Sequence, residues 1–353
     1  PGENTFGMPA VGSLSPAALT KTMAIELANT VRVFEKYFGP YPYKQLALTN
    51  IPFSYGQGWP GLIYLSMLSF LDSTQRNAFG IRDHVQLTDF FRAHESSHQW
   101  WGHRVGWKSY HDQWLSEGFA EFSGNLYVQI RRNNKEFLDR LRQDRQNLRG
   151  LRDDKNRLME SLGPIWMGRR LSTPDAPGAY SFLVYTKGGY VLHMLRMMMW
   201  DSRNPADPEV RFIAMMHDFT KTFDNKPAST EDFKAIVEKH MTPVMDVHGN
   251  RRMDWFFNQY VYGTGIPQYD FRYQVQDAGG GKWKVSGTVT RTGVPENWVD
   301  ILPLYIHQPK GAVRLGFITA DKSTTTFELP LLNFKPEKLS LNANEDILAE
   351  IKQ

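Results

Sequence analysis

A short histidine–glutamate pattern constrains the fold of this chain more than any other feature of its sequence. His94, Glu95 and His98 stand in the order His-Glu-x-x-His. Glu117 follows after eighteen intervening residues. On a helix, residues four apart lie on one face, so both imidazoles can point toward one atom. The interval leaves room for a turn near Gly106 and for a second helix that returns antiparallel, so the sequence predicts two packed helices sharing one cluster of ligands.

These residue types in this order indicate a catalytic zinc site. Such a zinc usually has three protein ligands and one open position for water, which assigns His94, His98 and Glu117 as the ligands. Zinc lowers the pKa of a bound water to about 7, and Glu95 is placed to accept the proton and return it to a leaving amine. A tyrosine hydroxyl would suit the oxyanion of the intermediate. The fifteen tyrosines leave that choice open.

Other residues near the motif compete for roles at the site. The competing interpretation of the motif itself is a surface helix whose two histidines happen to stand four apart. His84, His103 and His111 are rival ligands, but none has a partner at helical spacing, so we expect surface or hydrogen-bonded histidines. Asp112 and Glu121 are the nearby carboxylates that could orient the ligands. Glu121 lies one helical turn after the third ligand, and a solvated helix residue is its alternative.

The pattern of apolar residues changes along the chain and predicts two domains. Helical spacing predicts a helix over residues 22–38, and strand-like runs follow at 45–53 and 61–70. Helical stretches continue to about residue 262 and include 181–200. Short alternating runs separated by Gly, Pro and Asn fill residues 268–353, which is typical of a small β-sandwich. We therefore expect an α+β protein, with a mixed sheet-and-helix catalytic domain over 1–265 and an all-β sandwich over 266–353.

Composition excludes several classes of protein. There is no Cys, so disulfides, thiolate nucleophiles and Cys-based metal sites are impossible. The 41 Lys and Arg exceed the 37 Asp and Glu by too little to indicate nucleic acid as a partner. No apolar run is long enough to span a bilayer. Residues 131–170 are rich in Lys and Arg, and we interpret them as a solvated helix face without a function.

The first residue is Pro1 rather than Met, and no signal peptide is visible. We expect the chain to be a piece of a longer protein. An extracytoplasmic or membrane-associated location of the full-length protein is compatible with this sequence. No feature indicates a particular oligomeric state.

Longer segments around the motif resemble one known family. HQWWG follows the first histidines and WLSEGFA surrounds Glu117, while KYFGPYPY lies upstream and FFNQYVYGTGIP lies downstream. Together they are similar to the aminopeptidase N and leukotriene hydrolase group of zinc metallopeptidases, the gluzincins. This resemblance implies a thermolysin-like catalytic domain. It also selects Tyr185, in a Y-x-K-G segment, for the oxyanion role, with Tyr180 as the fallback and a plain core tyrosine as the alternative.

One segment departs from the family pattern. The family has G-A-M-E-N followed by W-G-L, and the glutamate that grips the substrate's amine aligns here with Gly58. No carboxylate stands between Asn50 and Leu71 to replace it. Since a buried ammonium needs an anionic partner, we expect altered N-terminal specificity. The main chain of this segment could instead bind an extended peptide by strand addition, through Gly56, Gln57, Gly58 and Trp59.

The sequence as a whole predicts zinc-dependent hydrolysis of peptide bonds, with a peptide or protein as substrate. Exopeptidase and endopeptidase action are both open. Two alternatives use the same fold. One is a catalytically weak peptide-binding or scaffold protein, which the loss of the anchor at Gly58 favours. The other is a hydrolase of a non-peptide substrate, because a metal-activated water can attack other electrophiles.

Overall fold

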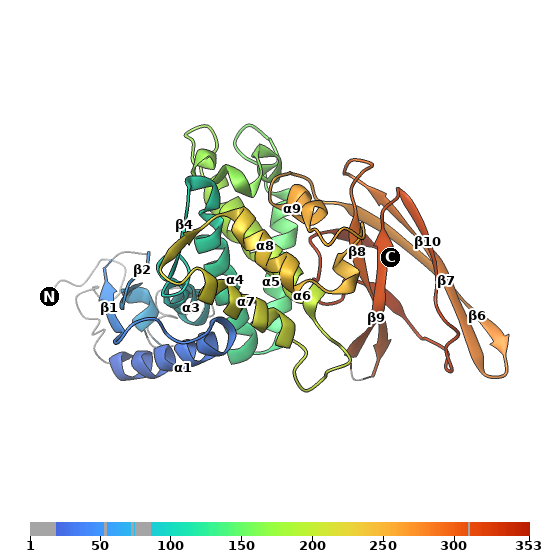
Figure 1. The fold of residues 1–353 in the computed structure, drawn as a ribbon, viewed down its shortest axis with the longest axis horizontal. Coiled ribbons are helices and arrows are strands. Elements are labelled where there is room, and N and C mark those ends of the chain that lie inside the picture. The colour runs from blue at the N-terminus through green and yellow to red at the C-terminus, as the bar shows by residue number, and fades with distance from the viewer. Residues whose placement is uncertain (1–18, 53–54, 72–73, 75–85, 310) are drawn as a thin grey trace. The chain divides into compact units, whose positions relative to one another are not determined.

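The structure is a computed structural model, and it describes residues 19–52, 55–71, 74, 86–309 and 311–353 (Figure 1). The chain divides into two compact units, each described here by itself. Unit 1 is Pro1–Arg140 with Met216–Thr230, and unit 2 is Leu141–Met215 with Glu231–Gln353. The predicted boundary at residue 265 falls inside unit 2, shortly before the first sandwich strand, and as a domain boundary it stays a prediction.

Unit 1 combines a small sheet with helices. Its elements in chain order are α1 (Thr20–Phe38), β1 (Ala47–Ile51), β2 (Gln57–Trp59), β3 (Leu62–Ser66), η3 (Met67–Phe70), η4 (Gln86–Phe90), α3 (Phe91–Ser97), β4 (Val105–Trp107), η5 (Tyr110–Asp112), α4 (Trp114–Arg131) and β5 (Lys226–Ala228). Helices α5 (Asn134–Gly150) and α7 (Val210–Thr222) each carry the chain from one unit to the other.

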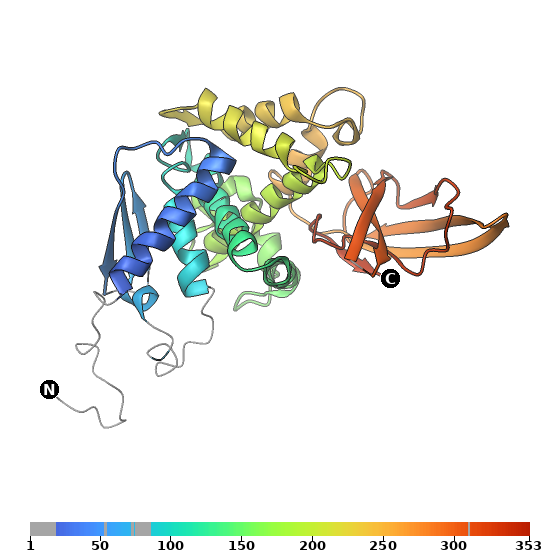
Figure 2. The same cartoon turned by 90° about the horizontal axis from the view of Figure 1, so that it is seen from below.

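Helix α1 closes one core of unit 1 against the sheet. The sheet has the order β1-β3-β2, with β1 parallel and β2 antiparallel to the central strand β3. Met23 and Leu27 of α1 pack on apolar side chains of β3 and η3, namely Ile63, Leu65 and Phe70. Figure 2 shows α1 and these strands within the unit. The predicted helix is confirmed to its last residue, because Gly39 follows it at φ 89°, a conformation that glycine adopts without strain.

Helices α3 and α4 pack against each other in the interior of unit 1 (Figure 1). All six residues from Arg92 to Ser97 are buried. Trp100 and Trp101, which follow α3, and Trp114, the first residue of α4, are fully buried. Large aromatic surfaces in this position stabilise the helix pair and keep most water away from the side chains between them.

Unit 2 holds further helices and the predicted sandwich. Its elements are η6 (Met159–Leu162), η7 (Ile165–Leu171), η8 (Ser181–Lys187), α6 (Gly188–Met199), α8 (Thr230–His240), η9 (Pro243–Met245), α9 (Asp254–Tyr260), β6 (Gln268–Gly279), β7 (Lys282–Thr292), β8 (Asp300–Gln308), β9 (Gly311–Ala320), β10 (Thr324–Glu328), β11 (Leu339–Leu341) and β12 (Glu350–Lys352). The strands form two sheets, β10-β7-β6-β12 and β11-β8-β9. The α+β class is confirmed. The helix predicted over 181–200 is a π-helix, η8, followed by α6.

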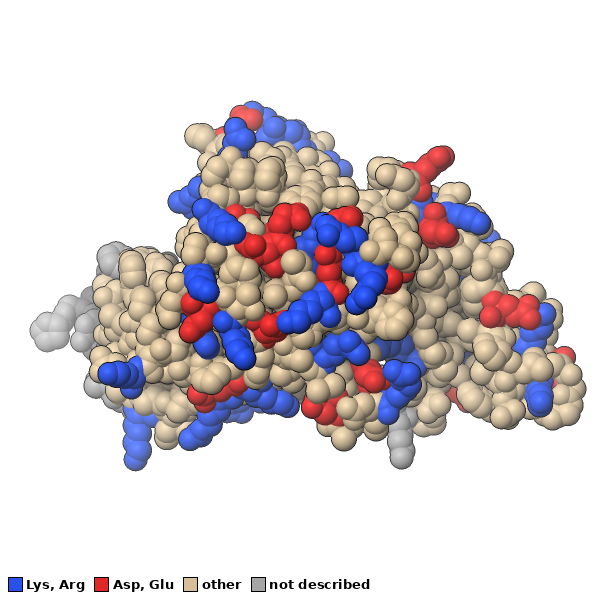
Figure 3. Space-filling view, viewed as in Figure 1, with Lys and Arg blue, Asp and Glu red and all other residues tan. Residues whose placement is uncertain are grey.

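The basic stretch after residue 131 differs from its interpretation as a purely solvated face. Arg145 of α5 donates to Glu345 at 2.7 Å and to Glu350 at 2.9 Å, and Arg149 donates to Glu350 at 2.6 Å. These arginines therefore hold α5 to the end of the chain within unit 2. On the face drawn in Figure 3, acidic and basic side chains lie intermixed. Among the described residues, no helix has both the length and the apolar surface to cross a membrane.

Candidate metal centre

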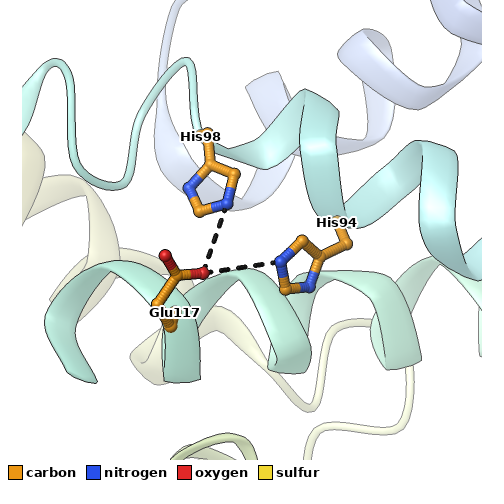
Figure 4. A group of neighbouring side chains, drawn as sticks. All are labelled: His94, His98 and Glu117. Atoms are coloured by element: carbon orange, nitrogen blue, oxygen red, sulfur yellow. Dashed lines mark ion pairs between the residues drawn. The ribbon is translucent and has the colours of Figure 1, made fainter. Parts of the chain in front are cut away.

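The two predicted histidine ligands and the predicted glutamate meet between α3 and α4. His94 lies on α3, His98 caps its C-terminal end, and Glu117 stands in the first turn of α4 (Figure 4). Nε2 of His94 lies 3.6 Å and Nε2 of His98 lies 3.5 Å from the same oxygen, Oε2 of Glu117. One ligand atom from each residue lies within 4.8 Å of the other two. The arrangement predicted from helical spacing is therefore present.

The three donor atoms fit a tetrahedral metal ion. At metal–ligand distances of about 2.0–2.1 Å, two ligand atoms of a tetrahedron lie about 3.4 Å apart. The measured separations of 3.5 and 3.6 Å are close to this value, and they are too long for strong hydrogen bonds. Two imidazole nitrogens and one carboxylate oxygen are a donor set that suits zinc. The residues present therefore fit the group that the sequence motif implies.

The electrostatics of the cluster favour a positive charge at its centre. Burial by itself would lower the pKa of His94, but contacts with Glu117 and Glu121 and the charge of Glu95 raise that pKa to about 10. The carboxylates thus favour a positive charge at the centre of the cluster. In the protein without metal, a proton on His94 provides this charge. Because a metal ligand must be neutral imidazole, metal binding there has to release that proton.

His98 is oriented by the chain that follows it. Its Nδ1 lies 3.0 Å from the main-chain oxygen of Trp101, and Ser116 Oγ lies 3.4 Å from the same nitrogen. A carbonyl can only accept, so Nδ1 carries the proton and the lone pair is left on Nε2, which faces Glu117. Sequence reasoning missed these partners. Ser116 precedes a predicted ligand, but a main-chain acceptor such as that of Trp101 leaves no mark in the sequence.

The two predicted orienting carboxylates have different positions. Glu121 Oε2 lies 3.5 Å from Nδ1 of His94, on the side of the ring opposite to Glu117, as an orienting partner should. Asp112 accepts hydrogen bonds from Ser109 and Thr230. Asp112 therefore fixes the turn before α4, and any effect on the ligands acts through the start of the helix that carries Glu117.

Glu95 is buried beside the two histidines. Burial raises the pKa of its carboxyl, while the neighbouring imidazoles of His94 and His98 and the nearby main-chain N–H of Gly58 lower it. The net shift is upward. A carboxylate whose pKa lies closer to neutrality exchanges protons more readily with water, which is the property that a general base and acid needs.

The predicted substrate strand lies directly on α3. Gly58, in the middle of β2, is so close that a Cβ atom there would stand 2.4 Å from the main-chain oxygen of Glu95 and 2.8 Å from Cβ of His98. A Cβ at Gly56 would stand 2.9 Å from the side chain of Glu95. Trp59 is half exposed at the end of the strand. The role of these residues and of Gln57 in binding a substrate stays a prediction.

Of the rival histidines, the two that the structure describes, His103 and His111, lie outside the ligand cluster. His103 Nε2 lies 2.6 Å from the main-chain oxygen of Gly58, so it is a hydrogen-bonded histidine, as expected. The ring of His111 packs against Tyr110, with centroids 3.9 Å apart. His84 lies outside the described residues.

The candidate oxyanion residue belongs to unit 2. Tyr185 lies on the π-helix η8, half-buried, with its ring edge-on to that of Tyr180 at a centroid distance of 5.8 Å. Tyr180 is buried, and the Arg169 guanidinium lies 5.0 Å from its ring centroid. Lys187, at the end of η8, forms a fully buried ion pair with Glu160 at 2.7 Å. The oxyanion role of Tyr185, and Tyr180 as its fallback, stay predictions.

Comparisons with known proteins show the family of this chain and similar folds. A family model described as "Peptidase family M1 domain" matches residues 24–260. Glutamyl aminopeptidase of Bitis rhinoceros is 32% identical over 235 residues, which are 64% of this chain and 23% of that protein. Glutamyl aminopeptidase of Bos taurus is 30% identical over 236 residues, which are 65% of this chain and 22% of that protein. The chain thus spans less than a quarter of the length of either.

Among solved structures, the crystal structure of Legionella pneumophila aminopeptidase A in complex with aspartic acid is similar, with a TM-score of 0.66. The match covers 95% of this chain and 35% of that chain, at 15% sequence identity. At that identity the likeness concerns the fold.

Proposed function

This chain belongs to peptidase family M1, and from that premise we propose that it hydrolyses peptide bonds at a zinc site formed by His94, His98 and Glu117. The observation that carries the proposal is the convergence of three ligand atoms, with separations of 3.5 and 3.6 Å, on one point between α3 and α4. Peptides or proteins are the substrates in this proposal.

Each residue of the proposed site has a distinct task. Zinc bound there would lower the pKa of a water molecule and polarise the substrate carbonyl. A carboxylate oxygen of Glu95 would accept a proton from the attacking water and return it to the leaving amine, a task for which its raised pKa is suited. The hydroxyl of Tyr185 donates a hydrogen bond to the oxygen on which negative charge develops. Glu121 holds His94 in its orientation.

The proposed specificity follows from position 58. A carboxylate that binds a substrate's charged amine contributes about 1.5–3 kcal/mol, or roughly ten- to a hundredfold in affinity. Gly58 has no side chain, and the contacts that a Cβ would make with α3 leave no room for one. We therefore expect less than about tenfold preference for a free over an acetylated N-terminus.

The test measures zinc and turnover together. Elemental analysis of the purified protein should find about one zinc per chain. Glu95→Gln should keep the zinc and lower turnover of peptides by at least ~100-fold, since the amide cannot accept the proton. Turnover on matched free and acetylated peptides decides the specificity, and a preference above ~100-fold for the free amine would restore ordinary aminopeptidase action.

A second candidate function is favoured by the missing carboxylate at position 58. A Cβ there would stand 2.4 Å from the main-chain oxygen of Glu95, so α3 leaves no room for a side chain that would bind a substrate's amine. A protein without that anchor would bind zinc and peptides yet turn over little, as a peptide-binding protein on the same fold. The same experiment separates the two functions. Zinc and peptide binding without any turnover that Glu95→Gln removes would support the binding protein.

A further inference from the structure

Among the strands that the structure describes, β2 is the outer strand of its sheet and pairs only with β3. The register is Gln57–Tyr64, Gly58–Ile63 and Trp59–Leu62, which leaves the other edge of β2 without a described strand. The main-chain groups on the free edge of such a strand can bind an extended peptide. Because β2 lies against Glu95 and His98, a peptide bound along this edge would run beside the proposed metal centre.

The main-chain carbonyl of Gly58 already has a partner from the turn after α3. It accepts a hydrogen bond from Nε2 of His103 at 2.6 Å. In an antiparallel pair, a residue directs its N–H and its C=O to the same side. Gly58 therefore turns both groups away from β3, toward the edge that a peptide would use.

This contact is held by the turn that follows α3. Gln99 donates to the carbonyl of Trp59 at 2.8 Å and accepts from the N–H of Gly61 at 2.8 Å, which fixes the end of β2. His103 stands on a turn rather than in a helix, half-buried, directly after Gly102, whose φ is +98°. Its ring can therefore leave the Gly58 carbonyl without a change in α3 or in β2.

We infer that His103 is a specificity-determining residue, which a peptide main chain must displace from the carbonyl of Gly58 before it can lie along β2. This inference rests on the proposed function and adds the step by which substrates gain access. A peptide N–H takes the place of the imidazole N–H on the Gly58 carbonyl. A peptide carbonyl then accepts the N–H of Gly58, so the bound main chain lies beside Glu95.

This exchange of hydrogen bonds favours substrates with an extended main chain and does not depend on their charge. The incoming partner needs one N–H and one C=O with the spacing of an extended peptide, and neither group has to be a charged amine. His103 and the substrate compete for one acceptor, the Gly58 carbonyl. The free energy of the His103 hydrogen bond therefore makes the free energy of peptide binding less favourable by the same amount. Removing a hydrogen bond of this kind should change affinity on the order of three- to tenfold.

The experiment compares His103→Leu with a matched control. The imidazole of His217 makes the same kind of contact, from Nε2 to the main-chain carbonyl of Lys36 at 2.9 Å, in the same unit but away from β2. His217→Leu therefore reports the general cost of losing such a bond. His103→Gln keeps a side-chain donor, and it should restore behaviour close to that of the unchanged protein.

Two readouts are measured on the full chain. The first is the dissociation constant for N-acetyl-penta-alanine amide, by calorimetry in the presence of a chelator that stops turnover. The second is KM and kcat of the zinc-loaded protein on an acetylated fluorogenic peptide. For His103→Leu we expect both the dissociation constant and KM to fall three- to tenfold, with kcat within about twofold. For His217→Leu we expect neither to change.

An unchanged or larger dissociation constant in His103→Leu overturns the inference, because His103 would then hold β2 in its working position. A fall in kcat without a fall in KM leads to the same conclusion. If the unchanged protein hydrolyses no peptide at all, the proposed function fails. The binding measurement still decides the role of His103 in that case.

Discussion

Two clusters of buried polar side chains, one in each unit, use their groups in opposite ways. In unit 1 the candidate ligand atoms stand 3.5 and 3.6 Å apart, so they face one another without closing hydrogen bonds. In unit 2 the carboxylate of Asp300 receives hydrogen bonds from Tyr260 and Trp298 at 2.8 Å each, and from the hydroxyl of Tyr269. The second cluster is complete within the chain, while the first converges on a point that a cation would fill.

The pKa shifts of the two clusters show the same difference between a cluster with internal partners and one that favours a cation. Burial raises the pKa of Asp300 to about 6, although its three donors and Arg291 oppose the rise. In unit 1 the carboxylates overcome burial and raise the pKa of His94 to about 10. The hydrogen bonds that Asp300 accepts therefore offset part of the cost of burying its charge. The carboxylates around the candidate ligands instead favour a positive charge at the centre of the cluster.

The largest expected effect breaks the first cluster. His98→Ala removes one of three ligands, so the protein should lose its zinc and more than ~1000-fold of its peptide hydrolysis. Elemental analysis and turnover on one acetylated peptide measure the two losses. Asp300→Asn is the control from the second cluster and should keep its zinc. A His98→Ala protein with one zinc per chain would show that the site lies elsewhere.

The next effect concerns tyrosine hydroxyls. The hydroxyls of Tyr260 and Tyr269 donate hydrogen bonds to the buried carboxylate of Asp300, which is a structural role. If Tyr185 instead serves the reaction, Tyr185→Phe should keep fold and zinc and lose on the order of 100–1000-fold in kcat. Tyr180→Phe is the matched control on the ring that touches it. A large loss in Tyr180→Phe with little change in Tyr185→Phe would reverse the assignment.

A smaller effect tests the orientation of a ligand. Glu121→Gln removes the charge beside Nδ1 of His94 and should weaken zinc binding about 10- to 100-fold. Competition with a chromophoric chelator measures that affinity. Asp112→Asn is the comparison, because Asp112 acts only through the turn before α4, and its effect on zinc should be smaller. Equal losses in both variants would show that Glu121 has no direct effect on the ligand.

The sequence predicted what depends on local spacing and missed what depends on distant partners. His94, His98 and Glu117 could be identified because helical geometry fixes how residues four apart are placed, and the interval to Glu117 allows one turn. The contact between His103 and Gly58 joins residues 45 apart, and no local pattern records it. A π-helix such as η8 differs from an α-helix by one residue per turn, too little for apolar periodicity to show.

The interpretation of the basic stretch of α5 as a solvated face was incomplete for a related reason. Its charges alternate as they would on a solvated face, and only the folded chain reveals that Glu345 and Glu350, some 200 residues later, pair with Arg145. Likewise, the sequence indicated only that Gly58 replaces a glutamate that binds a substrate's amine. The structure adds that α3 lies too close for any side chain at position 58.

The smallest effect on the metal centre is expected from Asp300→Asn, which should leave zinc binding and turnover within about twofold. Its signature is instead the pH dependence of stability. The pKa of Asp300 is raised from 3.8 to about 6 in the folded protein, so between these values the folded state binds a proton that the unfolded state has lost. The stability contributed by this proton is complete below about pH 4 and is lost as pH rises to 6.

A shift of about two units corresponds to about 3 kcal/mol. The free energy of unfolding of the metal-free protein, measured in urea from pH 4 to 7, should therefore fall by that much more in the unchanged protein than in Asp300→Asn. Contributions from all other groups cancel in the difference. Asp346, whose pKa burial also raises to about 6, offers Asp346→Asn as a parallel case. Parallel stability curves for Asp300→Asn and the unchanged protein would mean that this carboxylate is ionised as easily in the fold as in water, and the contrast between the two clusters would disappear.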